Sequence, residues 1–200
     1  MNGTRVVIVD SGGANIASLE FALQRLQVPV TLSADAGEIR AASHVLLPGV
    51  GAAGDAMARL RANGLAQVIP RLTQPLLGIC LGMQLLFESS AEGDTPCLGI
   101  LPGRAQRLPP AAGRPVPHMG WNTLQPCAAS PLLSGIECGA YAYFVHSYAL
   151  PLSEATTASC DYGLAFSACV QRANFFGAQF HPERSAQVGA RLLRNFLELH

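Results

Sequence analysis

The first eighty residues alternate between short apolar runs and segments with the spacing of a helix. Residues 5–10 (RVVIVD) form a run rich in β-branched side chains that ends in an acid. After this run, apolar residues recur three and four positions apart, at Ile16, Leu19, Leu23 and Leu26. An uninterrupted apolar run is typical of a strand buried on both faces, as in a parallel sheet. The alternation therefore predicts an α/β fold, in which helices connect parallel strands.

The same alternation continues as far as residue 80. Gly12, Gly13 and Asn15 suit a turn and a helix cap after the first strand. Three further apolar runs lie at residues 28–32, 44–47 and 75–80. They are separated by Ala-rich, Arg-bearing stretches that suit helices, so the first part of the chain is expected to form parallel strands with crossover helices.

After Phe87 the apolar runs become shorter and are broken by Gly and Pro. They lie at residues 99–108, 116–124, 141–148 and 164–170. We expect them to form a mostly antiparallel continuation of the same sheet, followed by a strand at 175–180 and a helix from about Ser185. Because no Ser-rich or charged linker interrupts the chain, residues 1–200 are expected to form a single domain.

The composition argues against several classes of protein. The 13 basic residues balance 13 acidic ones, so the chain lacks the basic excess that nucleic-acid binding requires. All 13 basic residues are Arg, so no Lys is present to form a Schiff base or to serve in a P-loop. The six Cys residues include no C-x-x-C pair, which favours a reduced, cytoplasmic chain. The start of the chain lacks the features of a signal peptide, and the longest strongly apolar run, residues 75–87, is too short to span a bilayer. We expect no nucleic-acid and no membrane partner.

The sharpest local motif is residues 75–84, PLLGICLGMQ. An apolar strand runs into G-x-C-x-G and then into helix-forming residues, which is the nucleophile-elbow pattern with Cys in place of Ser. Glycine is needed on either side because side chains there would collide in the tight turn. The thiol of Cys80 would lie at a helix N-terminus, which favours a thiolate. The alternative is a buried structural Cys among close-packed glycines.

A nucleophilic Cys needs a base and a group that orients the base. His181 and Glu183 follow the last predicted strand, and residues two apart in an extended segment face the same way. Pro182 between them favours that extended conformation at His181. A surface His-x-Glu without a role is the alternative. No metal site is expected, because no second His stands at helical spacing from His181.

Acyl transfer also needs donors for an oxyanion. The backbone N–H of Leu81, which follows the nucleophile, is one candidate. The turn at residues 48–51 (PGVG) follows a predicted strand, and its glycines let the N–H groups of Val50 and Gly51 turn toward a bound carbonyl. An ordinary turn at a strand end is the alternative.

Together, the PGVG turn, the Cys elbow and the His-Pro-Glu segment resemble the class I glutamine amidotransferases. The resemblance implies a flavodoxin-like, three-layer α/β sandwich with a central mixed, mostly parallel sheet. It also implies a Cys80, His181 and Glu183 triad that hydrolyses L-glutamine through a thioester and releases ammonia, with no cofactor.

Two further segments are similar to one branch of that family, the glutaminase subunits of imidazole glycerol phosphate synthases of histidine biosynthesis. They are residues 117–122 (PHMGWN) and 143–148 (YFVHSY). The likeness extends over essentially the whole chain, and it implies a heterodimer with a cyclase subunit that receives the ammonia.

The resemblance also implies roles for individual residues. Those expected to bind glutamine are Gly51, Gln84, Glu92, Ser147 and Tyr148. Those expected at the partner interface are Trp121, Tyr143 and Arg184. For two of them the residues leave another interpretation open, since Glu92 could be a solvated loop acid and Trp121 a core residue.

The chain departs from the common family pattern at Ser11, Ala14, Ala53 and Arg184, and Arg is not equivalent to Lys at an interface. None of these positions belongs to the expected triad. The alternatives to the proposed role are a glutaminase for another acceptor synthase, a Cys hydrolase or peptidase of similar fold, and a subunit that has lost activity.

Overall fold

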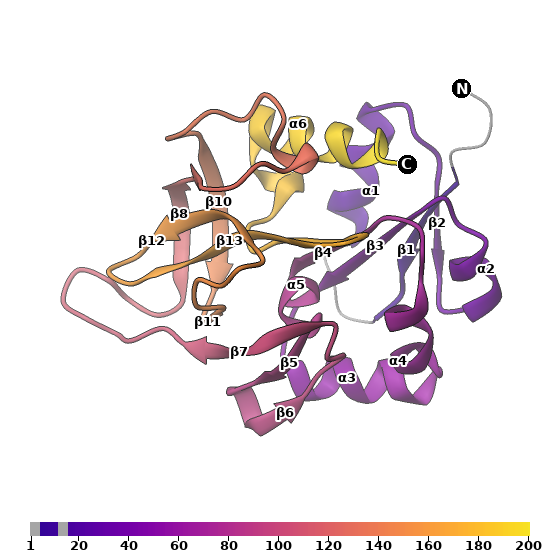
Figure 1. The fold of residues 1–200 in the computed structure, drawn as a ribbon, viewed down its shortest axis with the longest axis horizontal. Helices are drawn as coiled ribbons and strands as arrows, with labels where there is room; N and C mark the ends of the chain where they lie inside the picture. The colour runs from indigo at the N-terminus through magenta and orange to yellow at the C-terminus, as the bar shows by residue number, and fades with distance from the viewer. Residues whose placement is uncertain (1–4, 12–15) are drawn as a thin grey trace.

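A computed structural model of the chain describes residues 5–11 and 16–200. The turn and cap expected at Gly12, Gly13 and Asn15, and the departure at Ala14, lie outside the described residues. The core of the fold is an eight-stranded sheet with the order β2-β1-β3-β4-β14-β13-β12-β9 (Figure 1). Its strands are β1 (Val6–Val9), β2 (Val30–Ser33), β3 (His44–Gly49), β4 (Leu76–Cys80), β9 (Gln125–Pro126), β12 (Thr156–Asp161), β13 (Ala165–Arg172) and β14 (Phe175–Ala178).

The central sheet is mixed. Strands β2, β1, β3, β4 and β14 are parallel to one another, and β13, β12 and β9 then continue the sheet from β14 in antiparallel pairs. The prediction of a mixed, mostly parallel sheet is confirmed. Because the carboxyl ends of parallel strands share one edge, β3, β4 and the segment after β14 deliver their following residues to the same place.

Helices cover both faces of the sheet (Figure 1). Val6 and Ile8 of β1 belong to one core cluster with Leu19 and Phe196, whereas Val7 belongs to a second cluster on the opposite face. The first face carries α1 (Ile16–Arg25) and α6 (Ala186–Leu197), and the second carries α2 (Ala36–Arg40), α3 (Ala53–Ala62) and α4 (Leu65–Val68). The predicted three-layer sandwich is confirmed.

The shorter elements lie between these. The helix α5 (Leu81–Leu85) follows β4 directly. Single turns of 3-10 helix are η1 (Ile69–Arg71), η2 (Glu92–Asp94), η3 (Pro131–Leu133) and η4 (Pro182–Arg184).

The middle of the chain differs from the prediction. Only β9, β12 and β13 continue the central sheet, and two smaller sheets form beside it. One is an antiparallel pair of β8 (His118–Thr123) and β10 (Tyr141–His146). The other contains β11 (Tyr148–Ala149), β7 (Leu101–Arg107), β5 (Phe87–Ser90) and β6 (Thr95–Pro96). The expectation of one continuous sheet was therefore wrong, because a pattern of short apolar runs indicates strands without specifying their partners.

The β8–β10 pair shows how strands of this region can form a separate sheet. His118 on β8 and Phe144 on β10 are buried, whereas Met119, Trp121 and Tyr141 are exposed on the other face. Such one-sided burial suits a ribbon that packs one face on the body of the protein and leaves the other open.

Candidate active site

Cys80 lies in the sharp turn between β4 and α5. It has φ 53° and ψ −113°, a conformation that a residue with a side chain rarely adopts. The flanking glycines permit the turn: a Cβ on Gly82 would lie 1.7 Å from the Leu47 carbonyl oxygen, and one on Gly78 would lie 2.7 Å from the Gly82 carbonyl oxygen. The strand, turn and helix that the motif predicts are present.

His181 and Glu183 lie beside the elbow, after the neighbouring strand β14. Nδ1 of His181 and Oε1 of Glu183 are 2.8 Å apart, and the imidazole lies close enough to the Cys80 thiol for the thiol to affect its pKa. Burial lowers the pKa of His181, but the interactions with Cys80 and Glu183 outweigh burial and raise this pKa well above its usual range. The structure thus brings together the three residues of the expected triad, with His181 between Cys80 and Glu183.

Two further groups contact the Cys80 sulfur. The thiol donates to the Val145 carbonyl oxygen at 3.6 Å, and the Gln179 side-chain Nε2 donates to the sulfur at 3.8 Å. Sequence reasoning assigned no role to either residue. Gln179 stands two positions before His181, so the same extended-strand argument that paired His181 with Glu183 could have identified it.

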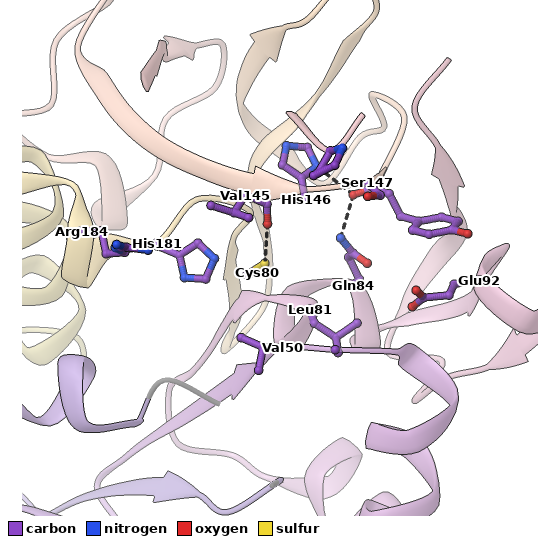
Figure 2. A pocket seen from close by; sticks show the side chains of 13 residues that line it. Val50, Cys80, Leu81, Gln84, Glu92, Val145, His146, Ser147, His181 and Arg184 are labelled. Carbon is purple, nitrogen blue, oxygen red and sulfur yellow. Dashed lines mark hydrogen bonds between the residues drawn. The ribbon is translucent and has the colours of Figure 1, made fainter. Parts of the chain in front are cut away.

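A cavity of about 410 Å³ opens over this site (Figure 2). Its lining includes these sequence-predicted residues: Val50, Gly51, Cys80, Leu81, Gln84, Glu92, Ser147, Tyr148, His181 and Arg184. Pro117, Val145 and His146 also line it and had been given no role. In the view of Figure 2, Gln84 lies between Cys80 and Glu92. Cys80 and Glu92 therefore line different parts of the cavity.

Side chains anchor the predicted oxyanion turn on both sides. The Ser11 hydroxyl donates to the Pro48 carbonyl at 2.9 Å, and the carboxylate of Glu92 accepts from the Ala53 backbone N–H at 2.7 Å. The structure thus shows what two of the residues that depart from the family pattern bind, Ser11 and Ala53. Ser11 holds the turn through its hydroxyl, and Ala53 takes part through its backbone N–H, which does not depend on the side chain at that position.

The expected interface residues gather on the outer face of the β8–β10 pair. The Trp121 and Tyr143 rings are 5.8 Å apart and edge to face, and the Arg184 guanidinium lies 5.0 Å from the Tyr143 ring centre. Trp121 is 52% exposed, so the interpretation as a core residue is wrong. Tyr143 and Trp121 do not line the cavity, whereas Arg184 lies at both the cavity and the aromatic cluster.

The described residues contain no group of three or more His, Cys, Asp or Glu side chains placed to hold a metal ion. All six Cys residues are free thiols. Among the helices of the described ranges, none is long and apolar enough to cross a membrane.

Comparison with known proteins identifies the family of this chain. Residues 7–199 match the class-I glutamine amidotransferase family. The imidazole glycerol phosphate synthase subunit HisH of Xylella fastidiosa is 60% identical over 196 residues, covering 98% of each chain. The subunit of the same name from Xanthomonas axonopodis pv. citri is 56% identical, again with 98% of each chain covered.

Solved structures agree at the level of the fold. One described as a glutamine amidotransferase aligns with a TM-score of 0.75 at 22% identity, covering 98% of each chain. The structure of PurLQS from Thermotoga maritima gives a TM-score of 0.73 at 19% identity, covering 96% of this chain and 97% of that one. With a Cys elbow, a neighbouring His-Glu pair and a family match over nearly its full length, this chain belongs to the class I glutamine amidotransferases.

Proposed function

We propose that the chain is the glutaminase subunit of an imidazole glycerol phosphate synthase in histidine biosynthesis. The observation that carries this proposal is the 55–60% identity to several HisH subunits, each over 98% of this chain. The cavity supports a glutaminase independently, because it is lined by Cys80, whose backbone is strained, and by His181, which is paired with Glu183. The reaction is the hydrolysis of L-glutamine to glutamate and ammonia.

The first half of the reaction forms a thioester. His181 takes the Cys80 proton, and the sulfur attacks the carboxamide carbon of glutamine. Backbone N–H groups of Leu81, Val50 and Gly51 stabilise the oxygen anion that develops. His181 then returns the proton to the leaving nitrogen, ammonia departs, and Glu183 stabilises the charged imidazole through its 2.8 Å bond to Nδ1.

The second half releases glutamate. A water molecule gives a proton to His181 and adds to the thioester carbon, and the same N–H groups stabilise the new anion. The C–S bond then breaks, and His181 returns its proton to the departing sulfur, which restores the thiol of Cys80. Throughout, glutamine is held along the cavity. Its ammonium group faces the Glu92 carboxylate, its side-chain amide contacts Gln84, and its carboxylate and backbone lie near Gly51, Ser147 and Tyr148.

The ammonia is expected to pass to a cyclase subunit in a heterodimer. The exposed rings of Trp121 and Tyr143, with Arg184 beside them, provide an aromatic and cationic surface next to the cavity, which suits a protein interface. We further propose that residues 1–200 act as one cytoplasmic domain that needs no metal or cofactor.

The test is ammonia release from glutamine by the purified chain, alone and with the cyclase subunit of the same organism and its nucleotide ligand. We expect strong stimulation in the mixture. In that complex Cys80→Ala should abolish glutamine-dependent synthesis and leave synthesis from ammonium salts intact. Loss of both glutamine-dependent and ammonium-dependent synthesis would mean that Cys80 is structural. Glutaminase activity that does not change when the cyclase subunit is added would indicate a different acceptor synthase.

A further inference from the structure

Two buried histidines lie on facing strands of the β8–β10 pair, and one of them, His146, lines the cavity. His118 and His146 occupy directly opposite positions in the strand register, and Nδ1 of His118 lies 3.0 Å from Nε2 of His146. The His118 ring is stacked between Phe144 and Tyr162, at centroid distances of 5.1 and 4.0 Å. Neither histidine belongs to the triad, yet both are held in one orientation.

One backbone carbonyl determines the direction of every hydrogen bond in this pair. Nδ1 of His146 lies 2.9 Å from the Tyr148 carbonyl oxygen, which can only accept, so Nδ1 of His146 carries a hydrogen. In the neutral ring Nε2 of His146 then accepts from Nδ1 of His118. Nε2 of His118 in turn accepts from the Asn122 amide at 3.3 Å. Because burial lowers the pKa of both histidines, both rings are neutral near pH 7, and their partners place the hydrogen of each ring on Nδ1.

The same carbonyl also orients groups on the cavity side. Gln84 Nε2 donates to the Tyr148 carbonyl at 2.8 Å and to Oε1 of Gln179 at 3.0 Å, which uses both of its hydrogens. Gln179 must then point its own Nε2 at the Cys80 sulfur, where a 3.8 Å contact is found. The amide oxygen of Gln84 is left to accept from a ligand in the cavity.

These bonds form one connected network: Asn122 donates to His118, His118 donates to His146, and His146 donates to the Tyr148 carbonyl, which also accepts from Gln84. We infer that His146 and His118 are positioning residues that hold the Gln84 amide in the orientation that receives an N–H group of bound glutamine. This inference rests on the proposed glutaminase function. His146 lines the cavity but is not a second base for Cys80, because both of its ring nitrogens are already engaged.

The test is glutamine binding measured by calorimetry on the full-length chain with Cys80→Ala, which removes turnover, in complex with the cyclase subunit. Adding His146→Leu removes the donor to the Tyr148 carbonyl, and we expect the Kd for glutamine to rise at least tenfold. Adding His146→Asn keeps a donor at the position of Nδ1, so the Kd is expected to stay within about threefold of the parent. This rescue separates positioning from general packing.

His44→Leu is the matched control. His44 is also a buried histidine whose Nε2 contacts a backbone carbonyl, that of Leu199, but it starts β3 away from the cavity. We expect that variant to bind glutamine within twofold of the parent while losing comparable thermal stability. Binding by His146→Leu that equals the parent would overturn the inference, and so would a His146→Asn variant as weak as His146→Leu.

Two further outcomes of this experiment also distinguish the inference from the proposed function. If His146→Leu does not fold, His118→Leu replaces it, since it removes the donor to Nε2 of His146 that helps to hold the His146 ring in place. A Kd raised at least threefold then supports the inference, and an unchanged Kd overturns it. If the Cys80→Ala parent itself binds no glutamine, the proposed function fails and this inference fails with it, whereas loss confined to the histidine variants leaves the function standing.

Discussion

Cys80 combines two features that a structural cysteine does not need. Its backbone has a positive φ, which costs on the order of 1–3 kcal/mol and persists only where the surroundings impose it. Its sulfur also contacts His181, the Val145 carbonyl and the Gln179 amide. A buried cysteine used only for packing is typically surrounded by apolar atoms, as Cys169 is at 0% exposure. The interpretation of Cys80 as a close-packed structural residue therefore does not account for its setting.

Glu183→Gln tests the orienting group. The substitution keeps the shape of the side chain but removes the charge that stabilises the His181 imidazolium, so we expect kcat of the complex to fall by roughly 10²- to 10⁴-fold. Thermal melting should change by only a few degrees. Glu198→Gln, at the exposed end of α6, is the control and should leave kcat unaltered. An undiminished rate for Glu183→Gln would move the orienting role to another residue.

At the scale of elements, the site depends on how closely α5 approaches β3. Gly82 lies against the Leu47 carbonyl, and a Cβ on Gly49 would lie 2.8 Å from the Gly82 backbone nitrogen. This close contact holds the oxyanion turn against the elbow around Cys80, because that turn begins where β3 ends at Gly49. On the other side, Ser185 accepts from the Tyr143 N–H and donates to the His181 carbonyl, which ties β10 to the catalytic segment.

Gly82→Ala tests the close approach of α5 to β3. Its new Cβ would collide with backbone atoms that cannot move independently, so we expect the free energy of unfolding to fall by about 3 kcal/mol or more, as for other severe overpacking. The measurement is urea unfolding followed by circular dichroism.

Gly54→Ala is the matched control, because its Cβ in helix α3 would meet only the Thr95 hydroxyl at 3.5 Å. That variant should be neutral or more stable by up to about 1 kcal/mol, since Ala favours the helix. Equal losses in the two variants would contradict the packing argument.

At the scale of the whole molecule, buried histidines make stability depend on pH in opposite directions. Burial lowers the pKa of His118 to about 4 and that of His146 to about 3, so the unfolded chain binds protons there first as the pH falls below about 6.5. His181 acts in the opposite sense. Its raised pKa adds stability that is present below pH 6.5 and is lost as the pH rises toward its folded pKa.

We expect the free energy of unfolding to decrease between pH 6.5 and pH 4.5, by a few kcal/mol at about 1.4 kcal/mol for each unit of pKa shift. Urea unfolding at several pH values measures this slope. His118→Leu removes one of the groups responsible, so its curve should be shallower than that of the unaltered chain. Parallel curves would show that His118 is not the source of the acid sensitivity.

The exposed aromatic face makes a separate prediction about assembly. Trp121→Ala should weaken binding of the cyclase subunit at least tenfold, because large aromatic side chains contribute most to such interfaces. Leu32→Ala is the control, since Leu32 is also an exposed apolar side chain but lies in β2, at the opposite edge of the central sheet from β12 and β9. Calorimetric titration of the partner measures both. If both variants bind equally well, the interface lies elsewhere on the molecule.

Local patterns in the sequence were sufficient to predict those features that depend only on residues close together in the chain. The elbow around Cys80, the alternation of parallel strands and helices, and the His181-Glu183 pair all follow from spacings of a few residues, because backbone conformation and side-chain direction are local properties. The resemblance to the family then supplied Gln84 and Glu92, which the structure brings to the same cavity.

Tertiary structure alone decided how distant segments meet. The Val145 carbonyl reaches Cys80, Gln179 joins Gln84, and His118 meets His146 only after β8 and β10 pair outside the central sheet. Each of these contacts joins residues far apart in the chain, and strand pairing is settled by which surfaces pack together rather than by any short motif. The sequence by itself therefore determined the chemistry of the nucleophile and its base, whereas the folded chain determined the hydrogen bonds that orient them and the shape of the cavity that holds the substrate.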